Sequence, residues 1–346
     1  MEKKGKQFRV GIAGYGVVGK RRRQFIDKNP IFKTVAICDQ NFKESGRMAD
    51  GVRFCPDHRR LLEEELDVLF VSLPNYLAAE VTIAGLEKNL HVFCEKPPGR
   101  DVNDIRRVID VESKRPGILL KYGFNHRYHD SVRDALKIIK SGRLGEIVNM
   151  RGIYGKSKII PFSGGWRAER RYAGGGILLD QGIHMVDLMR LFGGEFVEVK
   201  SFVSNSYWNH DVEDNAYALM RAANGCIAML HSSATQWQHR FQLDIALTEG
   251  YLQLSGILSG SKSYGQERLT IGSRDESDAG ALREETVTYL EDNSWNDEIN
   301  EFASAIENRT KIESGNSADA LATMMLVYKI YCADSNWAKK YNINND

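Results

Sequence analysis

The sequence has little that would support a metal centre or a disulfide framework. Its five cysteines are scattered, odd in number and without the C-x-x-C spacing of zinc sites: Cys38, Cys55, Cys94, Cys226 and Cys332. Scattered, unpaired cysteines are typical of proteins in a reducing compartment. We therefore expect neither a metal site nor structural disulfides.

Long apolar runs and an excess of one charge are also lacking. No apolar run approaches the ~20 residues that cross a bilayer, and a strand pattern begins too soon after Met1 to leave room for a signal peptide. Lys and Arg total 47 and Asp and Glu total 46, a formal net charge of +1. This balance predicts no nucleic-acid and no membrane partner, and the basic run Lys20-Arg21-Arg22-Arg23 is expected to be a solvated helix face. The whole pattern favours the cytoplasm.

Apolar residues are present in quantity, at 42% of 346 residues, and this length predicts two domains of roughly 100–200 residues each. Up to about Asn125, short apolar runs alternate with amphipathic stretches of helical length, which predicts a parallel, doubly wound α/β sheet. The expected strands are 8–13, 34–39, 68–73, 91–94 and 118–124, and the expected helices lie near 17–28, 58–65, 76–89 and 101–115.

The pattern changes after about residue 130. A helix near 130–141 is followed by longer strand patterns, with one helix near 176–191 among them. Asn224-Gly225 predicts a tight hairpin turn, because primed turns need positive φ. The stretch 256–284 reads as loops around a short strand, Leu269 to Ile271. The expected strands lie near 146–155, 195–204, 213–222, 225–233, 239–247 and 250–255. We predict domains 1–125 and 126–346, the second an α+β domain with a large open, predominantly antiparallel sheet; its helices near 294–308 and 317–338 could pack back on the first.

The first motif is G-x-G-x-x-G, at Gly14, Gly16 and Gly19, directly after the strand 8–13 and opening a helix. In that context Gly14 allows the tight turn, Gly16 lets the backbone approach a pyrophosphate, and Gly19 lets helix and strand pack closely. Asp39 ends the second strand, 20 residues after Gly19, where a carboxylate accepts ribose hydroxyls and repels a 2′-phosphate. NAD is thus favoured over NADP, the alternative being a glycine turn and an acid with no ligand.

Two further segments lie where parallel strands end, which is where ligands bind in such sheets. They are Ser72-Leu73-Pro74-Asn75 and Glu95-Lys96-Pro97-Pro98. Lys96 could hydrogen-bond a substrate hydroxyl beside the cofactor. The alternative is a surface Glu-Lys turn capped by prolines.

Asp180, His184 and Asp187 fall at i, i+4 and i+7 if 176–191 is helical, and would share one face. His184 is a candidate general base, with a carboxylate to orient it and tune its proton affinity. A structural histidine and a metal site are the alternatives, but no third ligand has matching spacing. His126 and His129 are interpreted as lying at the rim of a site or on the surface.

These elements resemble, in order over nearly the whole chain, the Gfo/Idh/MocA family, which includes glucose–fructose oxidoreductase and inositol dehydrogenases. The matching strings are the glycine motif, S-x-P-N at 72–75, E-K-P at 95–97, G-F-N-x-R at 123–127, W-R at 166–167 and G-G-G-x-x-x-D-x-G-x-H-x-x-D at 174–187. One departure is Ala78, where many members have His. The resemblance implies a Rossmann domain followed by an open-sheet domain.

The resemblance also implies roles for single residues. Lys96, Asp180 and His184 would form the catalytic group. The expected cofactor-binding residues are Gly14, Tyr15, Gly16, Val17, Val18, Gly19, Asp39, Ser72, Pro74, Asn75, Glu95, Lys96, Pro97, Trp166 and Arg167. The expected substrate-binding residues are Lys96, Asn125, Arg127, Arg167, Asp180 and His184.

The function this implies is NAD-dependent hydride transfer at a secondary alcohol or ketone of a carbohydrate. A sugar-modifying enzyme that recycles its NAD without net redox, and a non-catalytic NAD-binding regulator, are the alternatives. Arg167, Arg170 and Arg171 could hold the phosphate of a sugar nucleotide, or form a solvated basic loop. Apolar positions that look exposed, at Val197, Val199, Phe202 and Val203, favour a homodimer or homotetramer.

Overall fold

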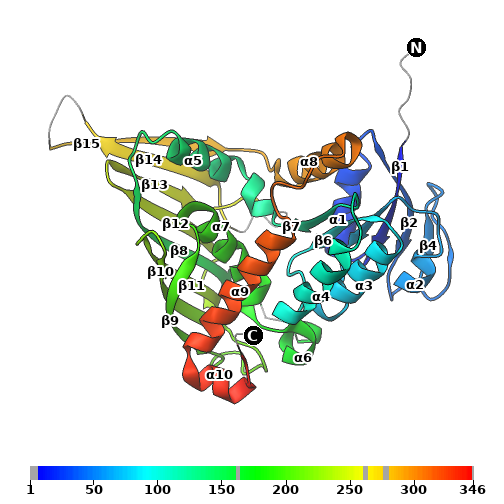
Figure 1. The fold of residues 1–346 in the computed structure, drawn as a ribbon. Coiled ribbons are helices and arrows are strands. Elements are labelled where there is room, and N and C mark those ends of the chain that lie inside the picture. Colours follow the sequence, from blue (N-terminus) through cyan, green and yellow to red (C-terminus); the bar gives the residue numbers. More distant parts are fainter. Residues whose placement is uncertain (1–6, 161–163, 260–263, 276–279, 345–346) are drawn as a thin grey trace, which may run out of the picture. The chain divides into compact units, whose positions relative to one another are not determined.

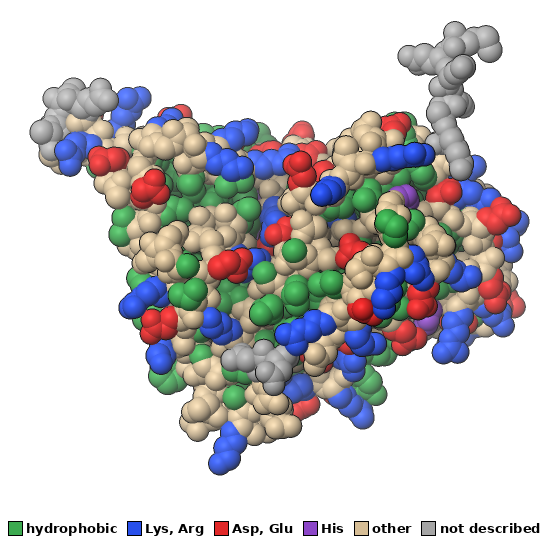
Figure 2. Space-filling model, in the orientation of Figure 1, with side chains coloured by type: hydrophobic (Ala, Val, Ile, Leu, Met, Phe, Trp, Pro, Cys, Tyr) green, Lys and Arg blue, Asp and Glu red, His purple; other side chains and the backbone are tan. Residues whose placement is uncertain are grey.

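A computed structural model describes residues 7–160, 164–259, 264–275 and 280–344 (Figure 1). The chain divides into two compact units, each built around one sheet. Unit 1 comprises Met1–Phe124 and Trp295–Ala322, and unit 2 comprises Asn125–Ser294 and Thr323–Asp346. No helix in the described ranges is both long and apolar enough to cross a membrane. Positive and negative side chains alternate over the face seen in Figure 2, in keeping with the balanced charge.

Unit 1 contains a seven-stranded sheet in the order β3-β4-β2-β1-β5-β6-β7. Every neighbouring pair is parallel except β3 with β4. The predicted doubly wound sheet is confirmed, whereas the two strands at one edge, β3 and β4, were missed because they are too short to show a pattern. The strands are β1 (Phe8–Ala13), β2 (Phe32–Cys38), β3 (Gly46–Arg47), β4 (Arg53–Cys55), β5 (Val68–Val71), β6 (His91–Glu95) and β7 (Leu120–Gly123).

The helices of unit 1 begin where the sequence supplies caps. The Asp57 carboxylate accepts from two backbone N–H groups of α2 and Asp101 from one of α4. Helices α3 and α4 lie side by side (Figure 1). Helix α8, from the later segment of unit 1, contributes Phe302, whose ring centroid lies 6.0 Å from that of Phe70 and 5.7 Å from that of Phe93. The helices are α1 (Val17–Ile26), α2 (His58–Leu61), α3 (Asn75–Glu87), α4 (Val102–Ser113), α8 (Ser294–Asn308) and α9 (Ser317–Ala333), within which the chain passes to unit 2.

Unit 2 contains an eight-stranded sheet in the order β15-β14-β13-β12-β8-β11-β10-β9. Only β8 and β11 pair in parallel, so the predicted open, mainly antiparallel sheet is confirmed. The strands are β8 (Ile147–Ser157), β9 (Phe196–Ser204), β10 (Asn215–Ala222), β11 (Ile227–Gln236), β12 (Arg240–Leu247), β13 (Gly250–Ser255), β14 (Glu267–Arg274) and β15 (Leu282–Tyr289).

Helix α7 packs on β8 and β11, and α5 packs on β13, β14 and β15 (Figure 1). Helix α7 covers Gly152 of β8 closely, and a Cβ there would lie 2.4 Å from the Met189 methyl carbon. The helices of unit 2 are η1 (Asn125–Tyr128), α5 (Asp130–Lys140), η2 (Trp166–Ala168), α6 (Arg170–Ala173), η3 (Leu178–Gly182), α7 (Ile183–Gly193) and α10 (Ser335–Tyr341).

Two local predictions for unit 2 differ in part from the structure. Strand β15 begins within the stretch 256–284 that was expected to be loops, of which 260–263 and 276–279 lie outside the described residues. It is an edge strand with almost every side chain exposed, so it has no buried alternation. In the β10–β11 turn only Gly225 has positive φ, at 91°. The predicted hairpin is confirmed, since β10 and β11 pair antiparallel on either side of Asn224-Gly225. Its turn is a longer loop with one left-handed glycine and not the expected primed turn.

One face of the second sheet carries exposed apolar side chains. Val197 and Phe202 of β9 are 55% and 79% exposed, as predicted, while Val199 and Val203 are only half-exposed. On β10 the alternation exposes Tyr217 and leaves its neighbours Ala216 and Ala218 buried.

Candidate active site

The glycine loop of unit 1 lies between β1 and α1, and two of its glycines are required by close packing. Gly14 has φ +90°, and a Cβ there would lie 2.3 Å from the Ser72 carbonyl oxygen. A Cβ at Gly19 would lie 1.9 Å from the carbonyl oxygen of Gly14. Both distances are far below van der Waals contact, so no other residue fits either position.

Gly16 has the opposite surroundings, because a Cβ there would meet no described heavy atom within 4 Å. It is the N-cap of α1, which has no side-chain cap and no acidic residue in its first turn. Val17, the first helical residue, is 78% exposed. The start of α1 is therefore an open, uncapped helix N-terminus, which suits a pyrophosphate.

The Asp39 carboxylate, after β2, is tied to the glycine loop. One oxygen accepts from the Tyr15 N–H at 2.9 Å, and the other accepts from the Asn41 N–H at 3.0 Å. The Asn41 side-chain amide also donates to that second oxygen, at 2.6 Å. A carboxylate has about four lone-pair sites, so one remains, on the oxygen that faces Tyr15, for a ribose hydroxyl. The hydrogen bonds from Tyr15 and Asn41 fix the position in which the Asp39 carboxylate would bind the ribose.

Ser72, Pro74 and Asn75 follow β5, the neighbour of β1 on the side opposite β2. Strand order reverses between β1 and β5, and ligands bind at such switch points. The Ser72 hydroxyl is buried and hydrogen-bonds to nothing within the described part of the chain. A buried hydroxyl beside an open glycine cradle fits a polar ligand, so these residues fit a bound dinucleotide.

Glu95 ends β6, one strand further along, and Lys96 and Pro97 follow it. Pro97 and Pro98 are buried, so the alternative of a capped surface turn does not hold. The Lys96–Pro97 peptide bond is cis. Lys96 is half-buried directly after the strand end.

Glu95 accepts a hydrogen bond from Arg22 of α1. Arg22 belongs to the basic run 20–23, which was expected to be solvated. That expectation was wrong for Arg22, whose side chain is fully buried. Its Nε donates to Glu95, and its Nη2 lies 2.7 Å from Glu298 of α8. Its guanidinium packs on the rings of Phe93 and Trp295, at 4.4 and 4.2 Å from their centroids. Burial raises the pKa of Glu298 to about 7 although Arg22 opposes this.

In unit 2 the predicted helix 176–191 is present as one continuous helical run, but its first part is π-helical. Residues Leu178–Gly182 form a π-helix that contains Asp180, and α7 begins at Ile183 with His184 in its first turn. Short π-helical segments often occur at functional sites. Asp187 is fully buried and accepts two hydrogen bonds of 2.7 Å from Arg127. Asp187 and Arg127 therefore form a buried ion pair within unit 2.

The start of this helix is fixed by Glu213, which the sequence gave no reason to select. Its carboxylate accepts from the N–H of Gly176 at 2.8 Å and of Leu178 at 3.0 Å. It also accepts from the Tyr331 hydroxyl at 2.6 Å. Gly176 must be glycine, because a Cβ there would lie 2.0 Å from the Glu213 carbonyl oxygen.

The interpretation of His126 and His129 as rim or surface residues was wrong, since both are buried. The His126 ring stacks on the His184 ring with centroids 3.7 Å apart and an interplanar angle of 12°. His129 pairs with Glu267, Nδ1 to Oε2, at 2.7 Å. Asn125 is also buried, 7% exposed.

The arginines near Trp166 do not form a common anion site. Arg167 stacks on Trp166 at 4.2 Å and lies 3.8 Å from an Asp180 carboxylate oxygen. Arg170 lies 3.7 Å from Glu213, and Arg171 pairs with Glu169 at 2.7 Å. Each guanidinium thus faces an acid of its own, and the solvated basic loop applies only to Arg171, which is exposed.

Two family models match this chain and together cover more than two thirds of it. The first, described as "Oxidoreductase family, NAD-binding Rossmann fold", matches residues 8–123. The second, "GFO/IDH/MocA C-terminal domain", matches residues 132–253. The chain belongs to the Gfo/Idh/MocA family. It is therefore an oxidoreductase-family protein whose first domain is of the NAD-binding Rossmann type.

Among Gfo/Idh/MocA relatives, levoglucosan dehydrogenase of Pseudarthrobacter phenanthrenivorans is 26% identical over 263 residues, covering 65% of this chain and 67% of the relative. D-glucoside 3-dehydrogenase of Escherichia coli is 28% identical over 250 residues, covering 65% of this chain and 70% of the relative. A solved structure of levoglucosan dehydrogenase in complex with NADH has a TM-score of 0.83 at 22% identity, covering 96% of this chain and 98% of that one. It shares the fold.

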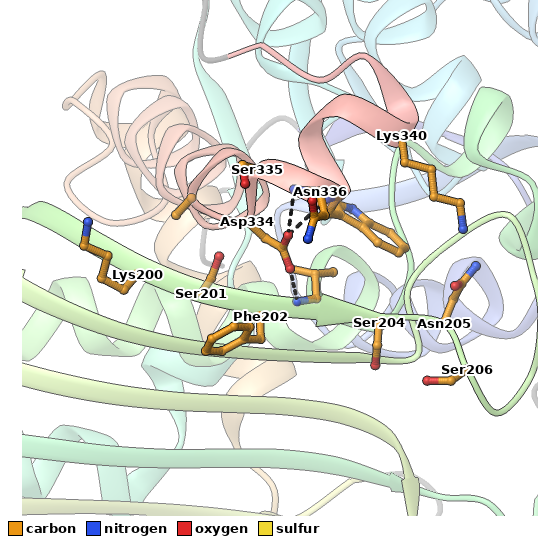
Figure 3. Close-up of a pocket in the computed structure, with 13 residues that line it drawn as sticks. Lys200, Ser201, Phe202, Ser204, Asn205, Ser206, Asp334, Ser335, Asn336 and Lys340 are labelled. Carbon is orange, nitrogen blue, oxygen red and sulfur yellow. Dashed lines mark hydrogen bonds between the residues drawn. The ribbon is translucent and has the colours of Figure 1, made fainter.

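The predicted residues of this Gfo/Idh/MocA chain gather in two groups, one in each unit. In unit 1 the cofactor residues follow β1, β2, β5 and β6, which are neighbours in the sheet. In unit 2 Trp166, Arg167, Asp180 and His184 lie on η2, η3 and α7. A surface cavity elsewhere in unit 2 contains none of them (Figure 3): it is lined by β9 and the start of α10, where Asp334 accepts from Val203 N–H and caps the helix.

Proposed function

We propose that this protein is an NAD-dependent dehydrogenase that oxidises a secondary alcohol of an uncharged carbohydrate, or reduces the corresponding ketone. The observation that carries the proposal is the chemistry at the two groups of residues. Unit 1 has an open helix N-terminus at Gly16 with Lys96 after a nearby strand, and unit 2 has an acid and a histidine, Asp180 and His184, at the start of a buried helix.

The cofactor is proposed to be NAD and not NADP. The Asp39 carboxylate is fixed by Tyr15 and Asn41 and would repel a 2′-phosphate. The residues proposed to bind it are those expected from the sequence: the glycine loop, Asp39, Ser72, Pro74, Asn75, Glu95, Lys96, Pro97, Trp166 and Arg167. Bound NAD would accept the hydride from the carbinol carbon, or NADH would return it.

The acid–base chemistry is assigned to side chains of this chain. His184 would take the hydroxyl proton, and Asp180 would orient the imidazole and offset its positive charge. Lys96 would donate a hydrogen bond to the same oxygen as negative charge develops on it. In reduction, His184 returns the proton to the ketone oxygen.

The substrate is proposed to be an uncharged sugar, glycoside or inositol. Arg167, Arg170 and Arg171 each face a separate carboxylate, which argues against a shared phosphate site of a sugar nucleotide. The names of two relatives, levoglucosan dehydrogenase and D-glucoside 3-dehydrogenase, favour the same class. Asn125, Arg127 and Arg167 remain proposed substrate-binding residues, although Arg127 is already paired with Asp187.

Two properties of the assembled protein are proposed with it. The exposed apolar side chains of β9 and β10, Phe202 and Tyr217 among them, support a homodimer or homotetramer that covers this sheet face. Light scattering tests this, and a monomer would contradict it.

The second property is the location of the protein. All five cysteines are free thiols, which favours the cytoplasm.

The test combines NAD calorimetry with absorbance at the NADH band for a panel of inositols, aldoses, glycosides and sugar nucleotides. NADH produced with one uncharged class supports the proposal. NAD binding without NADH would instead favour internal recycling or a regulator, and failure to bind NAD would contradict it. His184→Asn should lower kcat about 10²–10⁴-fold, whereas His231→Asn, which changes a stacked histidine on β11, should not. Full turnover by His184→Asn would refute the assignment.

A further inference from the structure

A line of hydrogen bonds runs through unit 2 from Asp292 to Tyr154. The Ser294 hydroxyl bonds the Asp292 carboxylate at 2.6 Å, and the Asn125 amide nitrogen bonds the Ser294 oxygen at 3.1 Å. The Asn125 amide oxygen lies 3.2 Å from His126 Nδ1, and His126 Nε2 lies 3.1 Å from the Tyr154 hydroxyl. Asn125, His126 and Tyr154 are all less than 10% exposed.

The direction of every bond in this line follows from its first member. The Asp292 carboxylate can only accept, so the Ser294 hydroxyl hydrogen is used there and the Ser294 oxygen must accept from Asn125. The amide oxygen of Asn125 therefore faces His126, whose Nδ1 must carry a hydrogen. In the neutral ring, Nε2 then accepts from Tyr154.

Tyr154 is suited to act as a donor. Burial, followed by the charges of Tyr264 and Asp180, raises the pKa of its phenol well above the usual value, so the hydroxyl keeps its hydrogen. The neutral Nδ1–H form of His126 is thereby bonded at both nitrogens.

One face of the His126 ring is covered by the ring of His184. A centroid distance of 3.7 Å with an angle of 12° is parallel contact between the two rings. Two imidazolium ions at this distance would repel strongly, so a proton on one ring opposes a proton on the other. A neutral His126 presents only its π electrons to a protonated His184.

Other charged groups near the stack have partners or sit beyond it. The acid beside η1, Glu267, bonds His129 at 2.7 Å and the Ser131 N–H at 3.0 Å. His129 meets His126 edge-on, at 5.4 Å. Of the titratable groups, His129 and Tyr154 of β8 contact the His126 ring. Next to them in the chain or in space lie the paired Arg127 and Asp187, Glu267 of β14 bonded to His129, and Tyr264 and Asp180, whose charges act on Tyr154.

We propose that His126 is a positioning residue for His184, held as the neutral Nδ1–H form by the line Asp292–Ser294–Asn125, so that the stacked His184 is the ring that takes the proton. This rests on the function proposed above. Asn125 thereby acts on His184 through His126, in addition to the substrate contact proposed above.

The kinetic test is the pH dependence of kcat/KM for alcohol oxidation, in which the acidic limb reports loss of the proton from the base. His126→Ala removes the stacked ring and should lower kcat/KM about 10- to 100-fold and displace the limb, whereas His126→Phe keeps a ring face and should lose less. The control His231→Phe changes a histidine stacked on Tyr217 at 4.0 Å and should leave the profile unchanged. An unchanged limb in His126→Ala would overturn the proposal.

Asn125→Asp is the sharper variant because it is isosteric and predicts the sign of a shift. A carboxylate against Nδ1 would favour protonated His126, which would oppose protonation of His184 and move the acidic limb to lower pH by roughly one unit. If His126 did not couple to His184, the added negative charge would move the limb to higher pH. That opposite shift, or none, refutes the coupling.

A readout that does not need activity separates this proposal from the function. Nitrogen-15 NMR of the histidine side chains, assigned with His126→Phe, should show His126 neutral with hydrogen on Nδ1 between pH 6 and 9, the rarer form in free histidine. Hydrogen on Nε2 would overturn the proposal even in an active enzyme. If His126 is neutral with hydrogen on Nδ1 but the protein oxidises no carbohydrate, the proposed function is refuted and the proposed coupling of His126 to His184 is not.

Discussion

Replacement of the buried Glu298 by Gln tests how unit 1 handles its buried charges. Glu298 and Glu95 both lie against the guanidinium of Arg22, so two carboxylates face a single, fully buried arginine. Glu298→Gln leaves Arg22 paired one to one with Glu95. Because the side chain is 0% exposed, solvent does not screen the effect.

The magnitude follows from the raised pKa of Glu298, about 7 against an ordinary value of 4.5, because burial outweighs the attraction of Arg22. Below pH 4.5 the carboxyl is protonated in both folded and unfolded protein. Between pH 4.5 and 7 the unfolded chain releases the proton first, so the free energy of unfolding falls as pH rises. At 1.36 kcal/mol per pKa unit the total fall is about 3 kcal/mol.

Urea unfolding between pH 5 and 8, followed by tryptophan fluorescence, measures this fall, since Trp295 stacks on Arg22. Wild type should lose stability over this range relative to Glu298→Gln, and the variant should be the more stable protein at pH 8 by up to about 3 kcal/mol. Glu307→Gln, exposed on the same helix, should keep the wild-type slope. A Glu298→Gln variant with that same slope, or one less stable at pH 8, would refute the reasoning.

Three further changes test the site and its supports. Gly19→Ala would bring a Cβ to 1.9 Å from the Gly14 carbonyl oxygen and should abolish NAD binding by calorimetry; wild-type affinity would contradict the packing argument. Asp39→Ala should weaken NAD binding by about 10-fold or more while sparing NADP, since the group that repels the 2′-phosphate is gone; an equal loss for both cofactors would speak against that role. Glu213→Gln should destabilise the protein by about 1–3 kcal/mol in urea unfolding, because one carboxylate oxygen that accepts from Leu178 and Tyr331 is lost; an unchanged midpoint would show that the cap is dispensable.

The features predicted correctly from the sequence are those set by neighbours in the chain. The strand Phe8–Ala13 and the glycine loop after it are a continuous signal, since the same few residues supply both the buried run and the turn. The strand-end positions of Asp39 and Lys96 follow from the lengths of short apolar runs. The open antiparallel sheet was likewise readable from alternation such as that of β10, where each second residue is buried.

The features that were missed depend on partners far away in sequence. Arg22 looked like a surface residue because its partner Glu298 lies at the other end of the chain. His126 stacks on His184 across 58 positions, and no periodicity relates η1 to α7. The π-helix around Asp180 depends on Glu213, which accepts hydrogen bonds from Gly176 and Leu178. No local sequence pattern predicts these bonds.

The discontinuity of unit 1 has a consequence for synthesis on the ribosome. The ring of Phe302 and the acid that faces Arg22 both belong to α8, which emerges only after residues 125–294 have been made. At roughly 5–20 residues per second, that delay is about 10–35 s. During this time the nascent Rossmann sheet holds Arg22 and an apolar face without their partners, so the first domain to leave the ribosome stays incomplete until most of the second has been made.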